Sequence, residues 1–231
     1  MTTLALHNNF RSSSSSRLRI ALALKQLPYT YVAVDLVAKA NYTPAYVALN
    51  PNRTVPTLVA TSSSSSEDEI VITQSSAALE YLEEAFPSAP PLLPPPTDPR
   101  GRAAARSIAA LCIADMQGPT SLRIMGRVNQ LAGADALSSY VREVTEVGLT
   151  ALERLLVHSA GKFCVGDTPT IADACLVPTV WNAVERLGVE EGRLASEWPC
   201  VKRVYENAMG MEAFRGAHWK RQVDCPEELR A

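Results

Sequence analysis

The chain has 231 residues, of which 47% are hydrophobic and 20% are charged, and its formal net charge at neutral pH is −2. This length allows one large domain or two small ones with a buried core. The near-neutral charge argues against nucleic-acid binding. No apolar run approaches the roughly 20 residues that a membrane-spanning helix needs.

Cysteine and histidine spacing gives no sign of a disulfide framework or a metal site. The cysteines are odd in number, scattered and without a CxxC motif, which favours reduced thiols in a cytoplasmic compartment. The histidines are too dispersed for a metal-binding pair on one helix. The first ten residues lack the basic and apolar regions of a secretory signal.

Alternating and helical patterns at the start of the chain predict a strand, a helix and a second strand. Leu4 and Leu6 alternate with smaller or polar residues, and a helical apolar face begins at Leu18. The run Tyr29–Leu36 has the composition of a strand. This order favours a parallel strand pair with a right-handed crossover.

Five consecutive serines, Ser12–Ser16, precede the first predicted helix and directly follow Arg11. A helix N-terminus has unpaired N–H groups and a positive dipole end, so it is suited to an anion. A serine there can also be an N-cap or part of a flexible turn. Because a cap needs only one serine, we favour an anion site at this turn.

The next segment predicts a short helix and a hairpin. A helix is expected over residues 41–49, a strand over 53–60 and a short strand over 70–72. Pro56 marks a sheet edge, a strand's first residue or a cis bond. The intervening residues 61–69 are polar and acidic, which predicts a mobile loop.

Gln74 and Ser75 stand at the predicted start of a helix that runs to about Phe86, and Ser75 is a suitable N-cap. The proline-rich stretch that follows is a stiff linker. We therefore divide the chain into an α/β domain at 1–86, a linker at 87–98 and an all-α domain at 99–231.

Helical patterns fill the rest of the chain. Asp98-Pro99 predicts a helix start, and Gly118-Pro119 predicts a break in the helical stretch near residues 103–128. Thr170 and Asp173 form a capping box before an apolar helix that Pro178 should kink. A last helix is expected near residues 200–208.

Several motifs occur together: RSSxSxRxRIAL, NPxxxVPTL, TQSSAALEYLEE, VGDxxTIADACLVP and NAVER. Jointly they resemble the zeta-class glutathione transferases, also called maleylacetoacetate isomerases, over nearly the whole chain. The resemblance implies the glutathione transferase fold: a thioredoxin-like βαβαββα domain, in which Pro56 is cis, followed by an all-helical domain. Ser14 stands where the family has a cysteine.

The resemblance also implies a glutathione site. Ser12 and Ser13 would hold the sulfur as a thiolate, which is the nucleophilic form of a thiol. A shift of one pKa unit needs only about 1.4 kcal/mol, so a hydroxyl and a helix N-terminus suffice. By matched position the glutathione-binding residues are Ser12, Ser13, Ser14, Ser15, Ser16, Arg17, Asn41, Val55, Gln74, Ser75, Gln117, Ser121, Leu122 and Arg123.

The family activity is the glutathione-dependent conversion of maleylacetoacetate to fumarylacetoacetate, in tyrosine and phenylalanine breakdown. An acidic substrate requires cations, and Arg11 and Arg186 are the candidates for its contacts. The resemblance also implies a cytoplasmic homodimer. Two alternatives stay open: a general detoxifying transferase, which the absent motif cysteine allows, and a non-catalytic binding module, against which the joint presence of the ligand residues argues.

Overall fold

The structure is a computed structural model that describes residues 2–62 and 69–230. The chain separates into two compact units, each described by itself below. Unit 1 comprises Met1–Leu92 and Glu212–Ala231, and unit 2 comprises Leu93–Met211. Residues 212–231 thus belong with the α/β region, whereas the sequence division assigned them to the helical domain.

The described residues of unit 1 form a four-stranded sheet with the order β2-β1-β3-β4. The strands are β1 (Thr2–Asn8), β2 (Thr30–Ala33), β3 (Thr57–Ser62) and β4 (Glu69–Ile72). Strand β1 runs parallel to β2 and antiparallel to β3, and β3 and β4 form an antiparallel hairpin. The predicted parallel pair and the predicted hairpin are both confirmed. At the ends of the predicted loop 61–69, residues 61 and 62 belong to β3 and residue 69 belongs to β4. Residues 63–68 lie outside the described residues.

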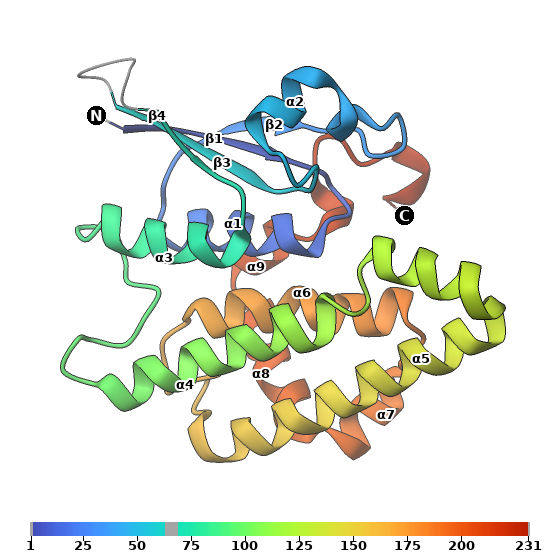
Figure 1. The fold of residues 1–231 in the computed structure, drawn as a ribbon. Helices are drawn as coiled ribbons and strands as arrows, with labels where there is room; N and C mark the ends of the chain where they lie inside the picture. The colour runs from blue at the N-terminus through green and yellow to red at the C-terminus, as the bar shows by residue number, and fades with distance from the viewer. Residues whose placement is uncertain (1, 63–68, 231) are drawn as a thin grey trace. The chain divides into compact units, whose positions relative to one another are not determined.

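Unit 1 also contains α-helices and short 3-10 helices. They are α1 (Ser13–Leu24), η1 (Ala40–Tyr42), α2 (Pro44–Leu49), α3 (Ser75–Ala85), α9 (Glu212–Gly216), η3 (Trp219–Arg221) and η4 (Glu227–Leu229). Helices α1 and α3 lie side by side on one face of the sheet (Figure 1). Their leucines Leu18, Leu22, Leu79 and Leu82 are fully or almost fully buried. Each contributes about 1.5–3 kcal/mol to the stability of this layer.

A buried ion pair fastens α1 to α3. Lys25 Nζ lies 3.3 Å from Glu83 Oε2 and also donates to the carbonyl of Pro90 at 3.1 Å. The same carboxylate oxygen accepts the N–H of Leu92 at 2.8 Å. The first part of the proline-rich linker is therefore held by unit 1.

Unit 2 is helical. Its helices are α4 (Pro99–Ala110), the π-helical η2 (Leu111–Gln117), α5 (Leu122–Ser159), α6 (Ile171–Arg186), α7 (Glu191–Glu197) and α8 (Pro199–Met209). Helix α6 forms the core, with contacts to α4 and α8. Its capping box is confirmed: Thr170 Oγ1 accepts the N–H of Ala172, and Asp173 accepts the N–H of Thr170 at 2.8 Å.

The predicted break at Gly118-Pro119 is also confirmed, since helical structure stops at Gln117 and restarts at Leu122. Proline lacks an N–H and cannot continue the ladder of hydrogen bonds. The predicted helix start at Pro99 is confirmed as well, with Asp98 Oδ1 accepting the N–H of Gly101 at 2.8 Å. Helices α7 and α9 were not predicted, because segments of 7 and 5 residues are too short to show a helical period.

Candidate functional site

The serine turn joins β1 to α1, and Ser12 is the N-cap of the helix. The Ser12 backbone is extended, and its Oγ accepts the N–H of Ser15 at 3.2 Å. A serine hydroxyl that accepts a hydrogen bond still has its own proton to donate. Ser12 can therefore cap α1 and donate to an anion at the same time.

The serines differ in exposure. Ser12, Ser13 and Ser14 are half-buried, whereas Ser15 and Ser16 are buried. Ser16 Oγ donates to the carbonyl of Ser12 at 3.2 Å and accepts from Arg19 at 2.8 Å, so it is engaged inside the protein. Ser15 Oγ is buried and makes no hydrogen bond within the described part of the chain. The first three serines are consequently the ones that a ligand can reach.

Arg19 is a buried side chain that donates hydrogen bonds to the serine turn and to the residues before it. It is 2% exposed and donates to acceptors on both sides of the turn. These are Asn8 Oδ1 at 2.8 Å, Asn9 O at 3.3 Å, Phe10 O at 3.1 Å, Ser16 Oγ at 2.8 Å and Ala217 O at 3.3 Å. Burial lowers the pKa of Arg19, and nearby Tyr31, Tyr29 and Asp224 oppose that shift.

Arg17 points away from Arg19, because residues two apart on a helix lie about 200° apart around its axis. It is 1% exposed, and its Nη1 donates to Ser75 Oγ at 3.2 Å and lies 3.5 Å from Ser14 Oγ. Ser75 begins α3, and Gln74 is the N-cap residue. A buried cation thus links two helix N-termini, and all three features favour a bound anion.

The peptide bond between Val55 and Pro56 is cis, which confirms the implied backbone conformation. Strand β3 begins only at Thr57, four residues after the predicted start at residue 53, because proline cannot donate to the sheet. Nearby, Asn41 Nδ2 donates to the carbonyl of Arg53 at 2.7 Å. Asn41 Oδ1 is buried and has no hydrogen-bond partner within the described residues.

The remaining predicted residues lie in unit 2, apart from Arg11. Gln117 ends η2, Ser121 is the N-cap residue of α5 and Arg186 ends α6. Leu122 is 68% exposed, and Arg123 is exposed beside it. The grouping of these residues with the serine turn stays a prediction. Arg11 is exposed, with its guanidinium carbon 5.7 Å from the centre of the Trp219 ring.

Two contributors to the site were missed from the sequence. One is Arg19, which the RxR spacing at Arg17 and Arg19 could have indicated. The other is Asp224, whose carboxylate accepts the N–H of Phe10 at 3.0 Å and the hydroxyl of Tyr31. The pKa of Tyr31 is raised, first by burial and then by this hydrogen bond.

Within the described residues, no group of three or more His, Cys, Asp or Glu side chains could hold a metal ion. None of the described helices is long and apolar enough to cross a membrane.

Comparison with known families gives two matches. The model for the glutathione S-transferase N-terminal domain matches residues 11–85, and the model for the C-terminal domain matches residues 132–207. A probable glutathione S-transferase of Coccidioides immitis is 46% identical, over 98% of this chain and 97% of that protein. Maleylacetoacetate isomerases of Emericella nidulans and Mus musculus are 45% and 39% identical, each over 97% of this chain and over 95% and 96% of their own lengths.

Solved structures of similar fold include maleylacetoacetate and maleylpyruvate isomerases. Maleylacetoacetate isomerase from Anaeromyxobacter dehalogenans, with glutathione bound in its active site, is 36% identical and superposes with a TM-score of 0.85, over 97% of this chain and 99% of that one. A bacterial zeta-class maleylpyruvate isomerase gives a TM-score of 0.84 at 35% identity, over 96% and 100% of the two chains. The chain therefore belongs to the glutathione S-transferase family. Its place within that family is the zeta class, which includes the maleylacetoacetate isomerases.

Proposed function

We propose that the protein is a glutathione-dependent cis–trans isomerase that converts maleylacetoacetate to fumarylacetoacetate and also transfers glutathione to small acidic electrophiles. The observation that carries this proposal is Ser12. Its half-buried hydroxyl lies at the N-terminus of α1, with a proton to donate while its oxygen caps the helix. Family membership and the activity named for the full-length relatives support it.

The residues of unit 1 fit glutathione. A tripeptide with a terminal carboxylate at its γ-glutamyl end suits the buried guanidinium of Arg17 beside Ser75 and Gln74. The backbone of Val55, before the cis-proline, is suited to pair with the peptide like an added strand. Asn41 Oδ1 is a buried polar atom without a partner within the described residues, and a ligand could satisfy it.

Glutathione, when bound, supplies a thiolate that adds reversibly to the cis double bond of the substrate and so allows rotation about it. The protein's part is positioning and electrostatics. Ser12 donates its hydroxyl hydrogen to the sulfur, and Ser13 is the second candidate donor. The N-terminus of α1 adds its dipole, so that the sulfur stays deprotonated without a side chain acting as a base. Replacement of the family cysteine by Ser14 leaves this hydroxyl mechanism intact.

Arg11 and Arg186 are our proposed contacts for the carboxylates of the acidic substrate. Arg11 follows the turn residue Phe10 and is exposed, which makes it accessible to a charged ligand. Gln117 and the segment Ser121–Arg123 are proposed to contact glutathione from the helical region, on the basis of their matched positions.

We also propose the finer assignments that follow from the family. These are a linker at 87–98 between the α/β domain and the helical domain, a homodimer, a cytoplasmic location and a role in tyrosine and phenylalanine breakdown. The scattered cysteine spacing supports a reducing compartment.

The decisive experiment measures formation of the trans isomer from maleylacetoacetate, with and without glutathione. Wild type, Ser12→Ala and Ser13→Ala are compared with Asp98→Ala, which removes an equivalent N-cap from α4. We expect glutathione-dependent turnover in wild type, a loss in kcat of about 100-fold in Ser12→Ala and normal kcat in Asp98→Ala.

Each other outcome has a definite meaning. If Ser12→Ala keeps full activity and Ser13→Ala loses it, the activating hydroxyl is that of Ser13. If wild type conjugates glutathione to α-haloacids but leaves maleylacetoacetate unchanged, the isomerase assignment is wrong and the protein is a general transferase. If wild type binds glutathione and does neither, it is a binding module.

A further inference from the structure

Residues 212–231 return to unit 1 and contact the elements around the serine turn. Helix α9 packs on α1, and the carbonyl of Ala217 accepts Arg19 Nε at 3.3 Å. The Trp219 ring lies with its centre 6.3 Å from that of Phe10 and under the guanidinium of Arg11. A segment some 200 residues away in sequence thus meets the turn that carries Ser12.

The most direct of these contacts is made by Asp224. One carboxylate oxygen accepts the backbone N–H of Phe10 at 3.0 Å, and the other accepts the hydroxyl of Tyr31 on β2. Tyr31 therefore fixes the orientation of the carboxylate, and the carboxylate fixes Phe10. Hydrogen bonds to an ionised acceptor are shorter and stronger than those between neutral groups.

Phe10 is held from both sides by side chains of opposite charge. Its N–H donates a hydrogen bond to Asp224, and its carbonyl accepts a hydrogen bond from Arg19 Nη2 at 3.1 Å. The following turn is closed by bonds to Asn9, whose Oδ1 accepts the N–H of Arg11 and whose carbonyl accepts the N–H of Ser12, both at 3.1 Å. Because these bonds to Asn9 close a tight turn around Phe10, a displacement of Phe10 is expected to move Ser12, two residues on.

We propose that Asp224 is a positioning residue for the serine turn, so that the segment 217–224 completes the sulfur-binding part of unit 1. The inference rests on the proposed function, since it assigns Asp224 to the placement of the Ser12 hydroxyl against glutathione sulfur. Catalytic contacts are sensitive to small displacements, and a shift of about 1 Å can cost 100-fold in rate. Removing Asp224 leaves the Phe10 N–H without its acceptor and releases the turn on that side.

The test compares wild type with Asp224→Ala, Asp224→Asn and Tyr31→Phe. The control is Glu228→Gln, which removes a negative charge from an exposed residue four positions further along the same segment. Three quantities are measured: the pKa of the bound glutathione thiol, from the ultraviolet absorbance of the thiolate against pH; KM for glutathione and kcat, separately; and the melting temperature.

In Asp224→Ala we expect the pKa of the bound thiol to rise and kcat/KM to fall by about tenfold, because the Ser12 hydroxyl is displaced from the sulfur. Asp224→Asn should recover part of the loss, because its amide oxygen can still accept the Phe10 N–H. Tyr31→Phe should show a smaller loss, and Glu228→Gln none.

A lower melting temperature in Asp224→Ala, with an unchanged thiol pKa and unchanged KM and kcat, would overturn the inference and leave Asp224 a tether only. Wild type that binds no glutathione would overturn the proposed function together with the inference. Wild type that binds and turns over normally, beside equally active variants, would overturn the inference alone.

Discussion

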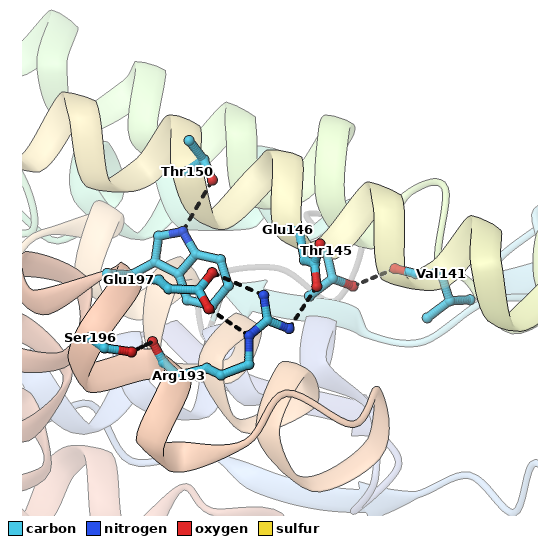
Figure 2. Close-up of polar contacts among 8 residues, drawn as sticks. Val141, Thr145, Glu146, Thr150, Arg193, Ser196 and Glu197 are labelled. Carbon is cyan, nitrogen blue, oxygen red and sulfur yellow. Dashed lines mark hydrogen bonds and ion pairs between the residues drawn. The ribbon is translucent and has the colours of Figure 1, made fainter.

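Two arginines, one in each unit, make several hydrogen bonds apiece in opposite surroundings. Arg19, in unit 1, is buried and donates to backbone and side-chain oxygens around the serine turn. Arg193, in unit 2, is partly exposed, with 37% of its side-chain surface accessible, and lies between two carboxylates. Its Nη1 is 2.7 Å from Glu146 Oε1, and its Nε and Nη2 bind Glu197 at 2.6 and 2.9 Å (Figure 2).

The pKa shifts of the two arginines are opposite in direction and differ in cause. Burial lowers the pKa of Arg19, because leaving water costs the charged form. The hydrogen bonds to Glu197 and Glu146 raise the pKa of Arg193, and the same contact lowers the pKa of Glu197. Water and salt can replace the partners of Arg193, whereas most of the partners of Arg19 are buried. The hydrogen bonds of Arg19 to uncharged, mostly buried acceptors should therefore matter more to stability than the ion pairs of Arg193.

The largest effect is expected from Arg19→Ala. Removal leaves the buried Asn8 Oδ1 and the half-buried carbonyl of Phe10 without this donor, so we expect a loss of about 3–5 kcal/mol in the free energy of unfolding. Urea denaturation measures this loss. Arg19→Lys should recover little of it, because an ammonium group cannot reach acceptors on both sides of the turn. A loss no greater than that of Arg193→Ala would contradict the comparison.

A smaller effect is expected from Lys25→Met, which removes the cation from the buried pair with Glu83. The methionine keeps the apolar volume, and Glu83 keeps the Leu92 N–H as a donor. We expect a loss of about 1–3 kcal/mol, insensitive to salt, because a buried pair is poorly screened. Urea denaturation in low and high salt measures it. Glu83→Gln is the matched variant from the other partner, and a strong dependence on salt would show that the pair is solvated.

Arg193→Ala should change stability least among the three cations. We expect the melting temperature to fall by about 1–3 °C in low salt. In about 1 M salt the Debye length is near 3 Å, so the difference should vanish. Thermal unfolding followed by circular dichroism at both salt concentrations tests this. The bond from Trp198 Nε1 to Thr150 Oγ1, 3.1 Å long, does not involve the guanidinium and should persist.

The smallest effect concerns His7, on β1 near the serine turn. Burial lowers its pKa, and Glu69 partly opposes the shift. The unfolded chain therefore binds a proton first as the pH falls below about 6.5, so stability is present above that pH and decreases as the pH falls towards the lowered folded pKa. The loss should stay under about 1 kcal/mol because the ring is half-exposed. Urea unfolding is measured at several pH values from about 6.5 downwards. The free energy of unfolding should depend less steeply on pH in His7→Gln than in wild type.

Features formed by neighbouring residues could be predicted from the sequence, whereas features formed by residues far apart in the chain could not. The serine turn, the cap at Ser12 and the cis bond at Pro56 follow from residues close together in the chain, or from motifs that the family shares. Burial of Ser15 and Ser16 was not predictable from residue type, since serine is usually exposed; it arises because α1 is covered on more than one side. The bond between Asp224 and Phe10 spans 214 positions and has no local pattern. The short helix α9, which brings that segment back, shows no period.

The return of residues 212–231 to unit 1 has a consequence for biosynthesis. Because a ribosome adds about 5–20 residues each second, Asp224 emerges roughly 10–40 s after Phe10, the residue it binds. All of the helices of unit 2 are made in that interval. The nascent serine turn therefore lacks its bond to Asp224, and the Phe10 N–H is open to water, until translation has passed through the helical unit.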